Sequence, residues 1–159
     1  MAITKTNAMR RLESAKIPYR VMEYTVDEND LSGTHIAEQI GLPYAQVFKT
    51  LVAKGDKTGP VVFCIPCDAE IDLKKAAALT GNKKIEMIHV KDLLALTGYI
   101  RGGCSPIGMK KVFPTVIHKT AADFETILFS GGKIGYQVEL KLEALRKIVR
   151  FELADITVK

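Results

Sequence analysis

The sequence lacks any apolar segment long enough to cross a membrane. Its longest near-continuous apolar run covers residues 61–67, whereas a transmembrane helix needs about 20 apolar residues. Residues 1–16 are polar and basic and contain no apolar core of the kind found in signal peptides. The three cysteines are too few, and odd in number, for a secreted disulfide framework. These absences predict a cytoplasmic protein without membrane association and with reduced thiols.

Nothing in the chain suggests a division into domains, since it has no internal repeat, low-complexity tract or linker. With 159 residues, of which 47% are hydrophobic and 26% charged, its size and composition are those of one soluble globular unit. We therefore expect residues 1–159 to form a single domain whose core needs neither a disulfide nor a metal.

Positive charge is concentrated in one part of the chain. The formal net charge is +5, and residues 74–133 contain ten Lys or Arg but only four Asp or Glu. A basic region of this kind favours a polyanionic partner, because phosphate contacts release counterions. A solvated lysine-rich surface would give the same composition.

Helical and extended patterns are mixed along the sequence without strict alternation. Helices are expected at residues 6–16, 34–40, 72–80, 90–96 and 142–148. Strands are expected at residues 19–24, 47–54, 60–66, 84–88, 112–117, 126–129 and 135–140, with a last one near residue 151, and the pair 47–54 and 60–66 reads as a hairpin. This order predicts an α+β fold with a mixed sheet, and a doubly wound α/β fold is the alternative.

Lys49 is the most informative single residue. It lies in the strand Val-Phe-Lys-Thr-Leu-Val at 47–52, where nearly every neighbour is apolar and burial on both faces is expected. A lysine there either extends to water or meets an anion, because an unpaired buried ammonium is costly. The second possibility would make Lys49 a cation that polarises a carbonyl or binds a phosphate.

Two glycine-rich segments follow expected strands or helices. They are Gly-Gly-Cys-Ser-Pro-Ile-Gly at 102–108 and Ser-Gly-Gly-Lys at 130–133. Glycines let the backbone approach a ligand closely, and successive N–H groups can bind an anion. Each segment could equally be a plain turn, and neither matches a P-loop or a Rossmann fingerprint.

The remaining motifs favour structural roles. Cys64 and Cys67 form a C-x-x-C spacing, but the next helical pattern begins several residues later, so we predict structural thiols. Asp68, Glu70 and Asp72 precede that helix and are expected to cap it. The three histidines have no ligand spacing, and we predict no metal site and no cofactor.

Four segments together resemble the YbaK/EbsC family of Cys-tRNA(Pro) deacylases, which is related to the editing domain inserted in bacterial prolyl-tRNA synthetases. They are Val-Phe-Lys-Thr-Leu at 47–51, Asp-Leu-Lys-Lys at 72–75, Gly-Gly-Cys-Ser-Pro-Ile-Gly-Met-Lys-Lys at 102–111 and Ser-Gly-Gly-Lys at 130–133. The resemblance implies a mixed, barrel-like sheet flanked by helices. It also implies hydrolysis of the ester between cysteine and the terminal adenosine of proline tRNA.

The resemblance also assigns site residues. It implies that Lys49 is the catalytic residue, and it places the substrate-binding residues at Tyr24, Thr50, Gly102, Gly103, Ser130, Gly131 and Gln137. At this last position the family usually has an aspartate, and the amide of Gln137 can form hydrogen bonds but cannot pair electrostatically with an ammonium. The implied partners are the acceptor end of a mischarged tRNA and prolyl-tRNA synthetase.

The mechanism proposed for the family explains why no protein nucleophile and base are visible in this sequence. If the cysteine thiol of the substrate attacks its own carbonyl, the protein only has to orient the ester and stabilise the oxyanion. Three alternatives stay open at this point: a deacylase for another substrate such as Ala-tRNA(Pro), a non-catalytic module that binds tRNA or a synthetase, and an oxidoreductase that uses Cys64 and Cys67.

Overall fold

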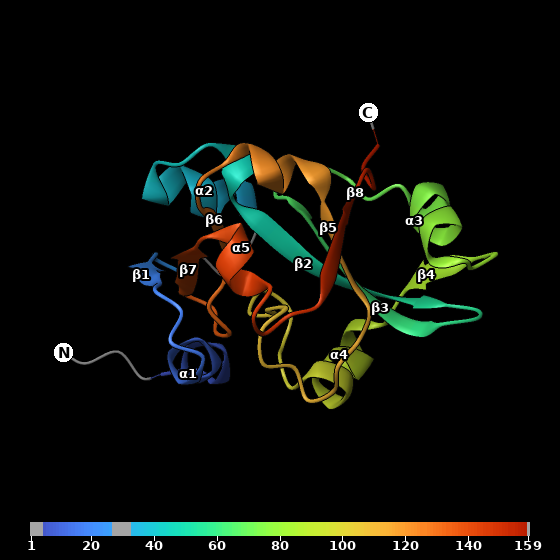
Figure 1. Cartoon of the computed structure of the whole chain (residues 1–159), viewed down its shortest axis with the longest axis horizontal. Coiled ribbons are helices and arrows are strands. Elements are labelled where there is room, and N and C mark those ends of the chain that lie inside the picture. Colours follow the sequence, from blue (N-terminus) through green and yellow to red (C-terminus); the bar gives the residue numbers. More distant parts are fainter. Residues whose placement is uncertain (1–4, 27–32, 159) are drawn as a thin grey trace.

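The fold is α+β, as the sequence predicts. A computed structural model describes residues 5–26 and 33–158 (Figure 1). Its helices are α1 (Asn7–Ser14), α2 (Gly33–Ile40), α3 (Leu73–Thr80), α4 (Val90–Thr97) and α5 (Leu142–Leu145), with 3₁₀ turns η1 (Tyr44–Gln46) and η2 (Lys119–Asp123). Its strands are β1 (Arg20–Glu23), β2 (Phe48–Gly55), β3 (Gly59–Pro66), β4 (Ile85–Met87), β5 (Thr115–His118), β6 (Ile127–Ser130), β7 (Tyr136–Leu140) and β8 (Phe151–Ala154).

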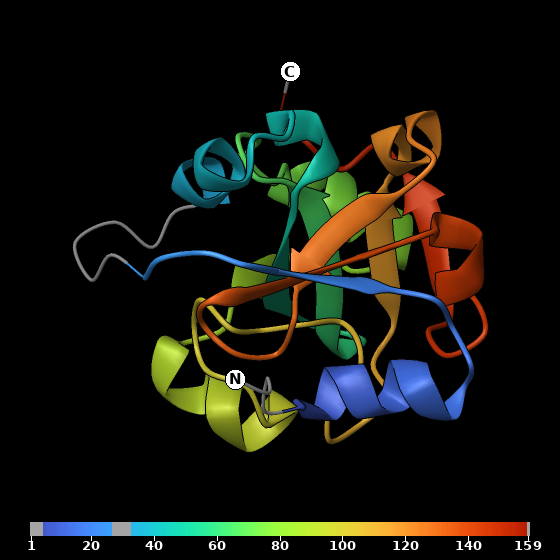
Figure 2. The same cartoon turned by 90° about the vertical axis from the view of Figure 1, so that its left-hand side faces the viewer.

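The strands form two sheets. The smaller has the order β1-β7-β6 and the larger the order β4-β2-β3-β5-β8. The larger sheet is mixed, because β3, β5 and β8 run parallel while β4, β2 and β3 run antiparallel. Figure 2 looks onto the smaller sheet, with the larger one behind it. A parallel bridge between Val47 and Leu128 joins the two sheets. The predicted barrel-like sheet therefore consists of two sheets that meet at this bridge.

Apolar side chains fill both faces of the larger sheet. On one face, residues such as Phe48 and Val52 pack with Phe129, Val138 and Leu12 between the sheets and α1. On the other face, a second cluster packs against α3. Burial on both faces explains why the sequence of β2 and β3 shows little polar alternation.

Local signals fix the ends of the helices. Thr6 Oγ1 accepts a hydrogen bond from the N–H of Met9 at 3.2 Å and caps α1, and the Asp72 carboxylate accepts from Lys74 and Lys75 at the start of α3. Both caps satisfy N–H groups that a helix start leaves unpaired. The capping prediction is confirmed for Asp72 only, since no described residue bonds the exposed carboxylates of Asp68 and Glu70.

Two predicted elements differ from the structure. The strand expected at 112–117 begins only at Thr115, because Val112 is 97% exposed and Pro114 has no N–H with which to join a ladder. The last helix ends at Leu145 rather than at residue 148. Within the described residues, no helix has the length and apolar character that a membrane span requires.

Candidate active site

Lys49 and Ser130 lie close to the bridge that joins the two sheets. The parallel bridge pairs Val47 of the chain entering β2 with Leu128 of β6. Lys49 and Ser130 each lie two residues beyond this bridge, so they face the same way as Val47 and Leu128 on their strands. Residues that lie opposite each other in neighbouring strands direct their side chains to the same face, so these two side chains share a face.

The neighbouring strands extend this alignment. Ser130 is paired with Gln137 of β7, and Gln137 with Met22 of β1. We call Lys49, Ser130 and Gln137 the cross-strand row. Residues that are far apart in the sequence therefore lie on one face of the molecule, and the side chains of this row are a cation, a hydroxyl and an amide.

Lys49 is a half-buried cation without a counter-ion. Its side chain forms no hydrogen bond or ion pair with any residue that the structure describes. The ammonium lies close enough to the Cys67 thiol to lower its pKa, although burial and Asp68 dominate and raise it to about 11. An unpaired cation in such a position costs free energy unless an anionic group of a ligand approaches it.

The backbone edge of β2 is open beside the row. On this edge, the chain entering β2 meets β6 at Val47, and β2 meets β4 from Ala53 onward, so Thr50 and Leu51 have no strand neighbour there within the described residues. The Thr50 hydroxyl lies on the opposite face from Lys49, 3.7 Å from the sulfur of Cys64. The structure therefore does not bring the Thr50 side chain into the row, and its contact with substrate stays a prediction.

The corner after β6 is held in a fixed shape. Ser130 Oγ accepts a hydrogen bond from the N–H of Gly132 at 3.2 Å. The Gly131 carbonyl accepts from Thr6 Oγ1 at 2.5 Å, and the Gly131 N–H donates to the carbonyl of Tyr136 at 2.8 Å. Among the described residues, the Ser130 hydroxyl proton has no acceptor, so this hydroxyl is able to donate to a ligand.

The two glycine-rich segments contact each other. A Cβ at Gly103 would lie 3.2 Å from the nitrogen of Ile134 and 3.3 Å from Cα of Lys133, so only glycine allows this approach without displacement. The Gly103 N–H donates to the carbonyl of Ile100 at 3.0 Å. Of these two glycine amides, that of Gly102 has no acceptor among the described residues, and the contact of both glycines with substrate stays a prediction.

Tyr24 follows β1 and lies beside Gln137. Burial raises the pKa of Tyr24, while the Gly135 backbone and the Gln137 side chain act in the opposite direction, so the phenol is close to both. The side chain of Gln39 in α2 bonds the N–H and the carbonyl of Thr25 at 2.8 and 2.9 Å. These contacts fix the end of β1 next to the row.

Gln137 is the most deeply buried member of the row, with 4% of its surface exposed. Its Oε1 has no hydrogen-bond partner in the described part of the chain. A buried amide oxygen that is left unpaired typically costs about 1–3 kcal/mol. Such a cost is common at binding sites, where a ligand completes the hydrogen bond.

Lys133 ends the Ser-Gly-Gly-Lys segment at 130–133, but it was not predicted as a site residue. It lines an open groove with Tyr24 and Gly135, and its ammonium lies over the ring of Tyr136 at 5.8 Å from the centroid. The signal was present in the sequence, since a lysine that directly follows two glycines on a turn is well placed to meet an anion.

The three cysteines lie near the site but do not have the properties of reactive thiols. Cys64, Cys67 and Cys104 are buried and unbridged. Burial raises the pKa of Cys64 and Cys104 to about 12, whereas redox-active thiols have lowered pKa values. The structure therefore supports the structural interpretation of these thiols. No group of three or more His, Cys, Asp or Glu side chains in the described residues has the geometry to hold a metal ion.

Comparison with known proteins decides the family. The family model described as "Aminoacyl-tRNA editing domain" matches residues 32–148. This chain belongs to that family. The match includes the whole cross-strand row and both glycine-rich segments.

Related sequences agree with this assignment. The editing domain is 52% identical over 155 residues to EbsC of Enterococcus faecalis, a protein assigned as a Cys-tRNA(Pro)/Cys-tRNA(Cys) deacylase; the alignment covers 98% of this chain and 94% of EbsC. It is also 26% identical over 156 residues to a proline--tRNA ligase of Thermosipho melanesiensis, covering 90% of this chain but 27% of the ligase. The likeness to the ligase is thus confined to one part of that enzyme.

Solved structures share the fold of this editing domain. A structure described as a trans-editing enzyme for prolyl tRNA synthetase superposes with a TM-score of 0.83 at 21% identity, covering 96% of both chains. The hypothetical protein APE2540 gives a TM-score of 0.86 at 17% identity, covering 96% of this chain and 100% of that one. These similarities confirm the predicted α+β fold.

Proposed function

We propose that this editing domain is a hydrolase that deacylates mischarged Cys-tRNA(Pro) in the cytoplasm. The observation that carries the proposal is Lys49, a half-buried cation with no counter-ion among the described residues, two positions beyond the bridge that joins its strand to that of Ser130. The name of its relative EbsC and the membership of the editing family support the same substrate class.

The substrate supplies the nucleophile in this proposal. The cysteine sulfur attacks the ester carbonyl, the carbon–oxygen bond to the terminal ribose breaks, and the ribose oxygen leaves with the thiol proton. Water then opens the resulting thiolactone and releases cysteine. The protein contributes by holding sulfur and carbonyl in attack geometry, which substitutes for a protein nucleophile.

Each residue of the site has a role in this scheme. The Lys49 ammonium, the Ser130 hydroxyl and the Gly102 N–H stabilise the oxyanion that forms during attack. The Gln137 oxygen accepts a hydrogen bond from the α-amino group of the substrate, and the Tyr24 phenol closes that side. Gly103 and Gly131 shape the wall of the site through the close backbone approach that they allow.

The tRNA partner follows from the family, and prolyl-tRNA synthetase is proposed as a second partner. A small deacylase that reads only the acyl group needs another source of tRNA identity. A synthetase that holds proline tRNA would supply it. Co-sedimentation of the protein with prolyl-tRNA synthetase, with and without tRNA(Pro), tests this association.

The central experiment compares Lys49→Ala with Lys54→Ala, an exposed lysine on the same strand. Removing an oxyanion-stabilising group typically slows catalysis by about 10²–10³-fold. We expect that loss for Lys49→Ala with an unchanged melting temperature, and near-normal turnover for Lys54→Ala. Equal activity of the two variants would refute a catalytic role for Lys49.

A panel of substrates tests the chemistry. Cys-tRNA(Pro) should be hydrolysed much faster than Ala-tRNA(Pro) or Ser-tRNA(Pro), because alanine has no thiol and a serine hydroxyl is a weaker nucleophile than a thiolate. Equal rates for cysteine and serine esters would exclude substrate assistance. Hydrolysis of none of these esters would leave a tRNA-binding module.

A further inference from the structure

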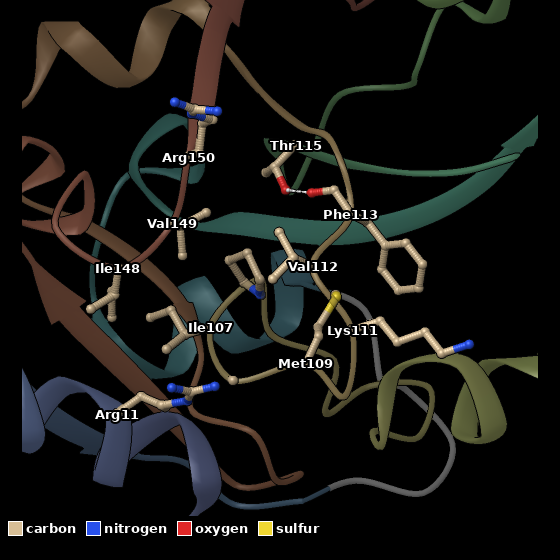
Figure 3. A pocket seen from close by; sticks show the side chains of 12 residues that line it. Arg11, Ile107, Met109, Lys111, Val112, Phe113, Thr115, Ile148, Val149 and Arg150 are labelled. Carbon is tan, nitrogen blue, oxygen red and sulfur yellow. Dashed lines mark hydrogen bonds between the residues drawn. The ribbon is translucent and has the colours of Figure 1, made fainter. Parts of the chain in front are cut away.

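A second cavity lies away from the cross-strand row. It has a volume of about 200 Å³ and is bounded by α1, by the segment that follows the glycine-rich loop and by the residues just before β8 (Figure 3). It shares no residue with the row or with the Tyr24 groove. The cavity is close to the proposed site along the chain. Gly103 of the site and Ile107 of the cavity are four residues apart, so their Cα atoms lie within about 14 Å of each other.

The charges around this cavity are all positive. Arg11, Lys111 and Arg150 line it, and none of the described residues that line it is acidic. None of these three side chains forms a hydrogen bond or ion pair with a described residue. Arg11 is exposed at the rim of the cavity. Unpaired cations around one opening attract an anionic ligand.

The centre of the cavity is apolar. Figure 3 shows the side chains of Ile107 and Val149 between Arg11 and Arg150, which lie at opposite ends, and the almost fully exposed Val112 lies at the opening. The Thr115 hydroxyl donates to the carbonyl of Phe113 at 3.1 Å and is therefore occupied. The space is smaller than the roughly 300–1,000 Å³ of pockets for drug-sized ligands, so it has room for one small planar group.

We infer that this cavity binds one unpaired nucleotide of the tRNA, with its base on the apolar centre and its flanking phosphates on Arg11 and Arg150. A nucleotide within a strand carries a phosphate on each side, which matches cations at both ends of an apolar patch. Arginine is well suited to phosphate because its guanidinium donates two parallel hydrogen bonds. The apolar centre makes the contact tolerant of base identity, as stacking contacts generally are. The inference rests on the proposed tRNA substrate.

The test uses matched pairs of charge deletions in the full chain. Arg11→Ala/Arg150→Ala removes the cations of the cavity. Arg10→Ala/Lys147→Ala removes two exposed cations that do not line it. Affinity for uncharged tRNA(Pro) is measured by fluorescence anisotropy over a series of salt concentrations.

We expect the first pair to weaken binding by roughly tenfold or more, with a reduction of about 1–2 in the slope of log K against log salt. The second pair should change affinity by less than about threefold. Equal losses for the two pairs would overturn the inference, because they would indicate a diffuse electrostatic surface. A free nucleotide has the same base and phosphate chemistry, so binding of adenosine 5′-monophosphate is measured as well. Tight binding of this nucleotide, combined with unchanged tRNA affinity in Arg11→Ala/Arg150→Ala, would also overturn the inference.

A second substitution guards against misfolding of the arginine variants. Val112 is almost fully exposed, so Val112→Asp places a negative charge at the cavity without disturbing the core. We expect it to weaken tRNA binding, whereas Val158→Asp, at another exposed position, should not. No difference between these variants would contradict the inference.

The two proposals fail separately. If Lys49→Ala abolishes deacylation but the cavity variants bind tRNA normally, the cavity inference falls and the enzymatic function stands. If tRNA binding depends on Arg11 and Arg150 but the protein hydrolyses no ester, the function falls and the cavity inference stands.

Discussion

At the scale of single residues, we expect Gln137 to lower the stability of the folded protein and to strengthen substrate binding. Its buried oxygen has no partner among the described residues, so Gln137→Leu removes an unsatisfied polar group from the interior. We expect the free energy of unfolding to stay equal or rise by up to about 1 kcal/mol. Deacylation should fall by roughly tenfold, because the hydrogen bond to the substrate is lost. Urea denaturation and single-turnover hydrolysis measure the two effects.

A paired glutamine provides the contrast for this prediction. Gln46 donates hydrogen bonds to the carbonyl and the hydroxyl of Thr126 at 3.0 and 3.3 Å. Gln46→Leu should therefore lose stability and keep its deacylation rate. If both variants lost stability and kept full activity, Gln137 would have no role in binding substrate.

Residue-level predictions from sequence succeeded where the signal was local. The position of Lys49 in an apolar strand predicted a lysine that either extends to water or meets an anion. The structure shows its side chain half-buried and unpaired among the described residues. The hydrogen bond from the Gly103 N–H to the Ile100 carbonyl could not be predicted from the sequence. It depends on how the loop folds back on itself, which no spacing records.

At the scale of elements, Asn82 fixes the hairpin of β2 and β3. Its Oδ1 accepts from the N–H groups of Lys57 and Thr58 at 2.8 and 3.0 Å, and its Nδ2 donates to the hydroxyls of Thr58 and Thr80 at 3.0 and 2.8 Å. Loss of this buried network in Asn82→Ala should cost about 2–4 kcal/mol. Chemical denaturation measures this loss.

Two further variants check the origin of that effect. A Cβ at Gly55 would lie 2.3 Å from Nδ2 of Asn82, so Gly55→Ala should destabilise the hairpin as well. Lys57 takes part through its backbone N–H only, and Lys57→Ala should stay within about 0.5 kcal/mol of the wild type. A strongly destabilised Lys57→Ala would show that the side chains of the turn, rather than Asn82, determine its stability.

His118 links the stability of the C-terminal segment to pH. Its Nδ1 accepts from the N–H of Ile156 at 3.3 Å, and burial lowers its pKa below the ordinary 6.5, with Asp155 acting in the opposite direction. Because the unfolded chain binds this proton more readily, stability should fall as pH drops below about 6.5 and level off below the folded-state pKa. Melting temperatures between about pH 7 and pH 5 test this.

The control for the pH effect is a variant that cannot be protonated there. His118→Asn keeps an acceptor near the position of Nδ1 and should show a smaller loss of stability over the same range. The exposed His89→Asn variant should behave like the wild type. An unchanged pH profile in His118→Asn would show that other groups cause the effect.

The elements themselves were predicted well where caps and glycines mark their ends. Asp72 and Gly81 bound α3 as expected, with Gly81 in the left-handed conformation at φ 78°. The segment at 112–114 misled the prediction, because an apolar residue next to an expected strand suggested burial. Val112 is instead exposed at the cavity that we assign to RNA.

At the scale of the whole molecule, sequence patterns predicted the α+β class but not the division into two sheets. That division depends on which strands pair, and one of the two pairs that build the smaller sheet joins segments far apart in the sequence. β1 at residues 20–23 pairs with β7 at residues 136–140. Local patterns carry no information about a partner more than a hundred residues away.

The pairing of β1 with β7 also determines when the protein becomes functional during its own synthesis. Thr6 bonds the Gly131 carbonyl, and Gln137 lies beside Met22. The segment up to β1 therefore lacks these partners until residues 131–137 have been synthesised. A nascent polypeptide still lacking β7 has Lys49 and the hairpin but no wall around them. A nascent chain that stops before residue 137 therefore has no formed site, and the editing activity has to wait for β7.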